Sequence, residues 1–195
     1  SAAGFLLRFL VMCDKIFIIN RWEDSAVELN DIYDKDRNRT GRVHKRGTPW
    51  APGEYGLVVC VWVHDGRGKL LMTRRARGKS YAGTWENSGG AAKAGEDSRT
   101  AIVRELFEET GIRAMPEAFE LLESDRDRNA FYDHYCLKCN AAITDIVLQP
   151  GETDGVQWVT FAQVHEMIRR KQICGIIGNQ FLRLEQRLLT RQSAQ

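Results

Sequence analysis

One stretch of the sequence decides how the chain folds, and it reads GAAKAGEDSRTAIVRELFEETGI from Gly90 to Ile112. Asp97 and Ser98 can each cap a helix, and Gly111 is a residue type that often ends one. The stretch therefore predicts a glycine-rich loop and then a helix that ends at Gly111. At about 100° per residue, its apolar side chains fall on one arc, which is expected to face the core. These apolar residues are Ile102, Val103, Leu106 and Phe107.

An acidic arc adjoins the apolar one, and it carries Glu105, Glu108 and Glu109 in the last two turns of the helix. These carboxylates repel one another and the helix dipole disfavours them, at a cost of about 1 kcal/mol if nothing compensates. Mg²⁺ or Mn²⁺ would compensate, because both prefer hard oxygen ligands. A solvated acidic face, with Arg104 paired to Glu108, is the simpler alternative. The glycines of the loop favour the metal, because backbone without Cβ can approach an ion or a phosphate closely.

The loop and the helix together resemble the Nudix box. That pattern is Gly, five residues, Glu, seven residues, Arg-Glu, an aliphatic residue, any residue, Glu-Glu, any residue, Gly and an aliphatic residue, and every fixed position is filled here. The resemblance covers about 54–170 and implies an α/β protein with the Nudix fold, an α/β/α sandwich around a mixed central sheet. It also implies a pyrophosphohydrolase, a metal-dependent enzyme that hydrolyses a diphosphate linkage in a nucleotide derivative or another small molecule.

The resemblance further implies roles for individual residues. The expected ligands of Mg²⁺ or Mn²⁺ are Glu105, Glu108, Glu109 and the carbonyl oxygen of Gly90. Glu96 precedes the helix and would reach Arg104 if the loop folds back, so that this pair braces the loop against the helix. The three box glutamates, Glu96 and Arg104 make up the expected catalytic group.

Hydrolysis also requires a carboxylate that takes the proton of the attacking water. Glu105 and Glu109 are the candidates inside the box. Glu152 and Asp154 are candidates outside it, and Glu152 is also expected as a metal ligand. These two residues lie in the sequence QPGETDG, so an interpretation as ordinary turn residues is equally good.

Basic and aromatic residues precede the box and are candidates for binding substrate. Guanidinium and ammonium groups bind phosphate, and those available here are Arg74, Arg75, Arg77 and Lys79. Tyr81 and Trp85 either stack on a base or pack the loop, and packing is the favoured interpretation for Trp85.

The remaining sequence predicts a mixed sheet between helices. A continuous apolar run over 57–63 predicts a strand that is buried on both faces and forms a hairpin with 69–73. Other expected strands are 119–123, 131–137, 143–148 and 156–159, with an irregular loop over 74–95. Two amphipathic helices follow, and a turn at Thr40-Gly41 joins two short extended stretches. We expect an N-terminal extension over 1–26 and a single domain over 27–195.

Composition narrows the function further. The chain of 195 residues has 28 Lys and Arg against 26 Asp and Glu, so bulk positive charge does not attract it to nucleic acid. Its five cysteines are an odd number and several lie in apolar runs, as expected of reduced thiols in a cytoplasmic protein. The apolar segment 5–12 is too short to span a membrane. The expected partner is a small diphosphate-containing molecule, with a homodimer through the N-terminal extension as a further possibility.

Two alternatives remain. Segments 31–34, 40–47 and 73–75 loosely resemble the branch of isopentenyl-diphosphate isomerases. Those isomerases use a Cys just before the box and a His-rich metal site, whereas the loop here reads WENSGG and His44 is the one similar histidine. Because isomerisation needs an acid at that place, the sequence favours hydrolysis. The other alternative, a nucleotide-binding module without turnover, is disfavoured by the intact set of carboxylates.

Overall fold

A computed structural model describes residues 27–193 of the chain, so the expected extension over 1–26 lies outside the described residues. The elements are the strands β1 (Leu29–Tyr33), β2 (Arg39–Lys45), β3 (Gly56–His64), β4 (Lys69–Arg75), β5 (Trp85–Glu86), β6 (Ser88–Ala91), β7 (Glu120–Asp127), β8 (Ala130–Lys138) and β9 (Thr153–Thr160), and the helices α1 (Ser98–Thr110), α2 (Phe161–Arg169) and α3 (Gly175–Ser193). Two short 3₁₀ helices, η1 (Pro116–Ala118) and η2 (Ile143–Asp145), lie between them.

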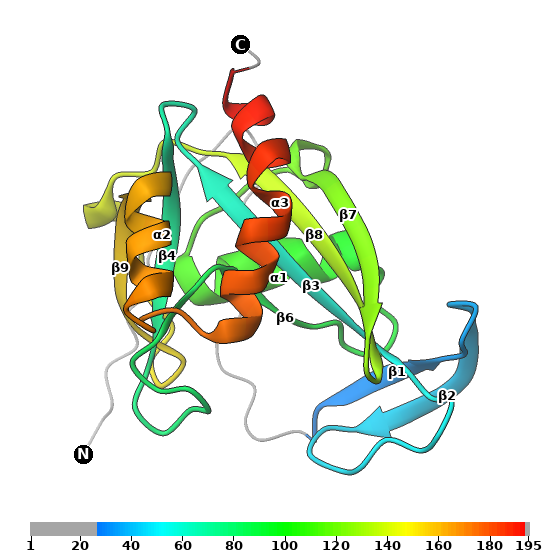
Figure 1. Cartoon of the computed structure of the whole chain (residues 1–195). Coiled ribbons are helices and arrows are strands. Elements are labelled where there is room, and N and C mark those ends of the chain that lie inside the picture. The colour runs from blue at the N-terminus through cyan, green and yellow to red at the C-terminus, as the bar shows by residue number, and fades with distance from the viewer. Residues whose placement is uncertain (1–26, 194–195) are drawn as a thin grey trace, which may run out of the picture.

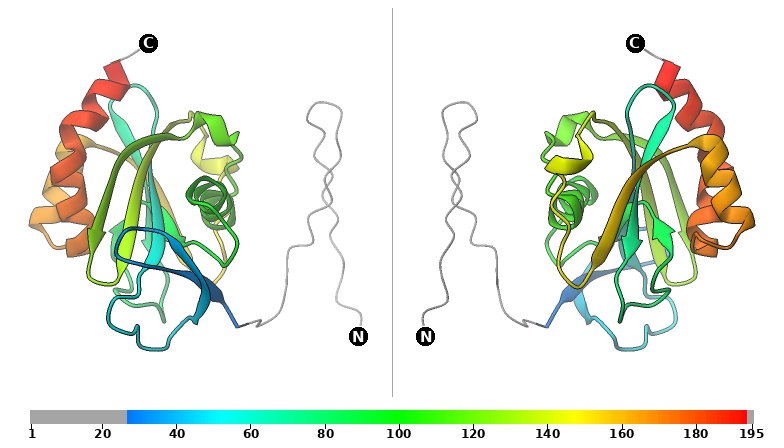
Figure 2. Two further views of the ribbon diagram at one scale, coloured as in Figure 1. Left: turned by 90° about the vertical axis from the view of Figure 1, so that its right-hand side faces the viewer. Right: turned by 90° about the vertical axis from the view of Figure 1, so that its left-hand side faces the viewer.

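A mixed sheet forms the centre of the molecule, with the strand order β5-β4-β3-β8-β7. β3 and β8 are parallel to each other, β6 pairs with β3, and β9 pairs with β4. Helix α1 covers one face of the sheet, and α2 and α3 cover the other (Figures 1 and 2). The expected α/β/α sandwich is therefore confirmed. The separate hairpin of β1 and β2 lies at one end of the sheet (Figure 1).

Strand β3 lies between two apolar layers, which explains its continuous apolar sequence. Val59 and Val61 pack into the layer under α1, whereas Trp62 packs with Phe181 and Leu184 of α3 in the opposite layer. All five side chains are fully buried. Because a central strand with both faces covered has no solvent side, its sequence cannot alternate between apolar and polar residues.

Helix α1 has the ends that the sequence predicts. The side chain of Asp97 accepts a hydrogen bond from the N–H of Thr100 at 2.7 Å, and Gly111 ends the helix with φ of 72°. Ile102 and Leu106 are fully buried against the sheet. Phe107 was expected to face the core but instead lines an open cavity, described below.

Three expectations about local structure are wrong. Residues 143–148 form no strand, because the N–H groups of Val147 and Gln149 donate to carbonyls at the end of α1 rather than to the sheet. The segment 74–95 is not irregular throughout, since β6 pairs with β3 where a Cβ on Gly89 would overlap the backbone of the neighbouring strand. The first hairpin turns at 34–38 instead of at Thr40-Gly41, because the Asp34 carboxylate accepts from two backbone N–H groups there.

The described residues contain no helix that is long and apolar enough to span a bilayer. Four cysteines lie in this part of the chain, Cys60, Cys136, Cys139 and Cys174, and all are free thiols.

Leu106 provides a test of this packing, since it is fully buried beneath the acidic arc of α1. We expect Leu106→Ala to lower the free energy of unfolding by about 2–5 kcal/mol, because it removes apolar contacts and leaves a cavity. Denaturant unfolding measures the change. Leu182→Ala is the control, because Leu182 is 49% exposed on α3, and it should shift the value by less than about 0.5 kcal/mol. Equal effects of the two variants would contradict the packing.

Candidate functional site

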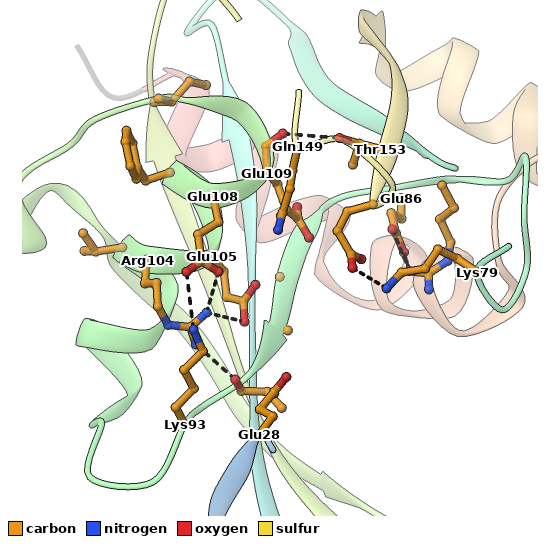
Figure 3. Close-up of a pocket in the computed structure, with 18 of the residues that line it drawn as sticks. Glu28, Lys79, Glu86, Lys93, Arg104, Glu105, Glu108, Glu109, Gln149 and Thr153 are labelled. Carbon is orange, nitrogen blue, oxygen red and sulfur yellow. Dashed lines mark hydrogen bonds and ion pairs between the residues drawn. The ribbon is translucent and has the colours of Figure 1, made fainter. Parts of the chain in front are cut away.

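A cavity of about 950 Å³ opens beside α1, and Figure 3 shows the residues around it. One wall is α1 with the loop before it, and the facing wall consists of β5, the segment after β4 and the loop that leads into β9. The hairpin of β1 and β2 contributes the residues at its open end, Glu28 and Arg46. The cavity therefore collects side chains from segments that are far apart in the sequence.

Arg104 holds the acidic wall of the cavity together. Its guanidinium donates to both carboxylate oxygens of Glu96, at 2.7 and 2.8 Å, as the sequence predicts. It also donates to Glu105 at 2.9 Å and to Glu108 at 3.0 Å, and it reaches the carbonyl oxygen of Ala91 at 3.1 Å. One side chain thus ties the loop and the helix into a single unit.

The pKa values of this group reflect burial and pairing. Burial acts to raise the pKa of Glu96, but the hydrogen bonds from Arg104 and from the N–H of Lys93 hold it below its usual value. Burial acts to lower the pKa of Arg104, and the hydrogen bond to Glu96 and the nearby carboxylates raise it well above its usual value. Both groups are therefore charged in the folded protein at neutral pH.

Glu109 is in a different position from the other box glutamates. Figure 3 shows it between Glu86 and Glu105. Burial raises the pKa of Glu109 well above its usual value, and the charges of these two neighbours raise it further, whereas hydrogen bonds from the Ser88 side chain and the N–H of Gly89 act to lower it. Its Oε2 atom is buried and has no hydrogen-bond partner within residues 27–193. A buried carboxylate oxygen without a partner is costly, so this atom is suited to a cationic ligand.

Gly90 fits the same interpretation. A Cβ at this position would overlap the carboxylate of Glu105, so no other residue type fits without displacing that group. Burial raises the pKa of Glu105 despite the neighbouring guanidinium of Arg104. The carboxylate therefore packs directly on backbone, as the sequence predicts for the glycine-rich loop.

The donor set fits a hard divalent cation, although it is not assembled around one. Across residues 27–193, no three His, Cys, Asp or Glu side chains are already grouped to hold a metal ion. Glu105 and Glu108 are instead paired with Arg104. The chemistry of these oxygen donors and the unpartnered atom of Glu109 nevertheless match the ligands that Mg²⁺ and Mn²⁺ prefer.

The facing wall contains two further ion pairs. Arg75 binds both oxygens of Glu86 at 2.7 Å, and Lys79 binds Glu152 at 2.5 Å. Arg75, Lys79 and Glu152 were candidates from the sequence, and the structure brings them to the cavity. Their roles in binding phosphate or metal remain predictions.

Other candidates lie outside the cavity lining. Arg74 donates a hydrogen bond to Asp154 at 2.6 Å, and its Cζ atom lies over the Trp85 ring, 5.7 Å from the ring centroid. Tyr81 is 62% exposed. None of these four residues, nor Arg77, lines the cavity, so the packing interpretation of Trp85 is the better supported one.

Several cavity residues had no signal in the sequence. They are Glu28, Arg46, Glu86, Lys93 and Arg113. The β1–β2 hairpin reaches the site because Asn30 donates to the carbonyl of Ala92 at 2.8 Å and Asp31 accepts from the N–H of Gly95 at 2.9 Å. Such contacts join segments about sixty residues apart, and no local pattern reveals them.

Cys60 is on the far side of the sheet from this site. Its Sγ lies 3.1 Å from Nδ1 of His134, in the layer beneath α3, and burial raises the pKa of its thiol to about 12. The expectation that Cys60 is a core thiol is confirmed by its 6% exposure. It offers no acid to the cavity.

Comparison with known proteins places this geometry in a family. Residues 54–174 match the model of the NUDIX domain, and the chain belongs to that family of proteins. An uncharacterized Nudix hydrolase of Listeria monocytogenes is 31% identical over 67% of this chain and 78% of its own length. An isopentenyl-diphosphate Delta-isomerase of Escherichia coli is 29% identical over 64% of this chain and 72% of its own. Membership of this family implies a hydrolase. The match to the isomerase agrees with the looser resemblance of the sequence to the isomerase branch.

A solved structure also resembles the fold. A crystal structure from Deinococcus radiodurans superimposes with a TM-score of 0.67 and 22% identity, covering 80% of this chain and 98% of that one. At this identity the likeness concerns the fold alone.

The buried charge of Glu109 leads to a test by stability. Because burial raises its pKa, the folded state binds this proton more tightly than the unfolded chain, and ionisation above the folded pKa destabilises the fold. In metal-free protein at neutral pH, Glu109→Gln should raise the free energy of unfolding by about 1–3 kcal/mol. The gain should vanish as the pH falls below the ordinary range of a glutamate.

Glu108→Gln is the matched control, because it removes ion pairs to Arg104 and Lys93 and should give no gain. Thermal unfolding across pH measures both variants. A Glu109→Gln protein that is less stable than the parent at neutral pH would show that the carboxylate is satisfied.

Proposed function

We propose that the chain is a metal-dependent pyrophosphohydrolase that cleaves a phosphoanhydride bond in a nucleotide derivative or another small diphosphate. The observation that carries this proposal is the complete box with its loop folded onto Arg104 and with an unpartnered oxygen on Glu109. The reduced cysteines suit an enzyme of the cytoplasm.

The acidic wall would hold the metal. Mg²⁺ or Mn²⁺ bound by Glu105, Glu108, Glu109 and the carbonyl of Gly90 would screen the phosphate oxygens and lower the pKa of the attacking water. Glu152 on the facing wall is a further candidate ligand, paired in this structure with Lys79.

The chain's own residues would do the rest of the work. Glu109 is buried beside the cavity and has a raised pKa, and it is the first candidate for the carboxylate that accepts a proton from the attacking water. Glu105 shares this direction of shift and is the second candidate base. Arg75 and Lys79 face them across the cavity and would bind phosphate oxygens, exchanging one acidic partner for another.

An isomerase acting on isopentenyl diphosphate is the second candidate, since such enzymes are among the relatives. It requires an acid next to the box glycine to protonate a carbon–carbon double bond. The chain has Ser88 and Gly89 there, and the buried Cys60 faces the opposite side of the sheet. The arrangement therefore favours hydrolysis.

An assay of turnover tests the proposal. Nucleoside diphosphate derivatives, nucleoside triphosphates, dinucleotide cofactors and isoprenoid diphosphates are incubated with Mg²⁺ or Mn²⁺, and ³¹P NMR follows the phosphorus species. We expect at least one to be hydrolysed, chelation to abolish the reaction, and Glu105→Gln or Glu109→Gln to lower kcat at least about 100-fold.

Glu185→Gln is the control, because Glu185 pairs with His165 on the far side of the sheet and should leave kcat unchanged. Conversion of isopentenyl diphosphate into its isomer, followed by ¹H NMR and with no release of phosphate or pyrophosphate, would instead identify an isomerase. Absence of turnover on the whole panel, or full activity in both glutamate variants, would refute the proposed roles.

A further inference from the structure

Nearly all the cations around the cavity are already paired with carboxylates. The pairs are Arg46 with Glu28, Arg75 with Glu86, Lys79 with Glu152, Lys93 with Glu108, and Arg104 with three glutamates. Arg113 is the exception, since it forms no ion pair or hydrogen bond with any side chain of residues 27–193. It is exposed and lies two residues beyond Gly111, the residue that ends α1.

The guanidinium of Arg113 lies flat against an aromatic ring instead. Its Cζ atom is 4.3 Å from the centroid of the Phe107 ring. Val103, one helical turn before Phe107, and Ala114 extend this part of the cavity lining with apolar surface. The cavity therefore has an acidic half at the box glutamates and an apolar half in which, among residues 27–193, Arg113 is the one unpaired cation.

The two halves adjoin, because Phe107 and Glu108 both line this cavity and each lies about one helical turn from Arg104 on α1. One molecule can therefore place a charged group at the glutamates and an uncharged group on the ring and guanidinium. The chemistry of the second half distinguishes between ligand groups. A phosphate would gain little from the apolar lining, and an aliphatic chain would cover the guanidinium without offering it a partner. A planar π-system suits both the guanidinium and the apolar lining, because it stacks on the first and covers the second.

We propose that Arg113 and Phe107 form a stacking subsite for an aromatic ring of the substrate, such as a nucleobase. The ring lies on the guanidinium of Arg113, which Phe107 supports from behind. This inference rests on the proposed function for the position of the diphosphate, and it places the aromatic group beside α1 rather than at Tyr81 or Trp85. It also favours aromatic over isoprenoid diphosphates.

The test separates the ring from the diphosphate. Arg113→Ala and Phe107→Leu are compared with the parent protein on ADP-ribose and on methyl diphosphate, which lacks a ring. Loss of one stacking partner should raise KM for ADP-ribose about tenfold, with kcat little changed. The kinetics with methyl diphosphate should be unaffected. Binding of AMP, followed by calorimetry in the absence of turnover, should weaken by the same factor.

Arg126→Ala is the matched control. Arg126 also stacks on an aromatic ring, that of Tyr55 at 5.2 Å, but it does not line the cavity. It should change neither AMP binding nor KM. Circular dichroism and thermal unfolding establish that Phe107→Leu remains folded, and the exposed Arg113→Ala gives an independent measurement.

The outcomes separate the subsite from the function. Hydrolysis of ADP-ribose with a KM that neither variant changes refutes the subsite and leaves the hydrolase standing. Equal losses on ADP-ribose and methyl diphosphate assign Arg113 to phosphate and also refute the stacking. If no diphosphate is hydrolysed, but the parent protein binds AMP and both variants bind it more weakly, the proposed function fails and the subsite stands.

Discussion

The rest of the site depends on the ion pairs that Arg104 forms with three carboxylates. Glu96 comes from the loop, whereas Glu105 and Glu108 come from the helix, so the guanidinium fixes one segment against the other. The arrangement also neutralises a helix end at which negative charge is unfavourable. Removing one partner from a largely buried network of this kind costs about 3–5 kcal/mol, because the other charges lose compensation. The box arginine is therefore a structural requirement before it has any part in chemistry.

Glu109 forms no ion pair with Arg104, in contrast to Glu105 and Glu108. Two other carboxylates lie beside Glu109, and one of its oxygens has no hydrogen-bond partner in the described part of the chain. An unsatisfied buried group lowers stability, and such groups concentrate where function requires them. The overall charge of +2 does not reveal this organisation, because basic and acidic side chains of the cavity are paired and their charges cancel in the sum. To bind a metal and an anionic substrate, the carboxylates of such a site would exchange their basic partners for the metal, and the basic groups would exchange their carboxylates for the substrate.

The sequence predicts those features that local patterns determine. The ends of α1 follow from Asp97 and Gly111, and the burial of β3 follows from its continuous apolar residues. The contact between Glu96 and Arg104 follows from the box. Phe107 was misplaced because the helical period gives the angle between side chains but not the width of the surface that a sheet covers. Arg46 and Arg113 reach the cavity through tertiary packing, which leaves no trace in local spacing.

Binding of Mn²⁺ to the substrate-free protein tests the central claim most directly, namely that the box carboxylates act together as a cation site. The measurement combines electron paramagnetic resonance of free Mn²⁺ with thermal unfolding. We expect the parent protein to bind Mn²⁺ and to gain thermal stability as the Mn²⁺ concentration rises, because an ion that binds only the folded state stabilises it. The Glu105→Gln, Glu109→Gln double variant should lose both effects. No binding by the parent, or equal binding by the double variant, would show that these carboxylates do not form a cation site.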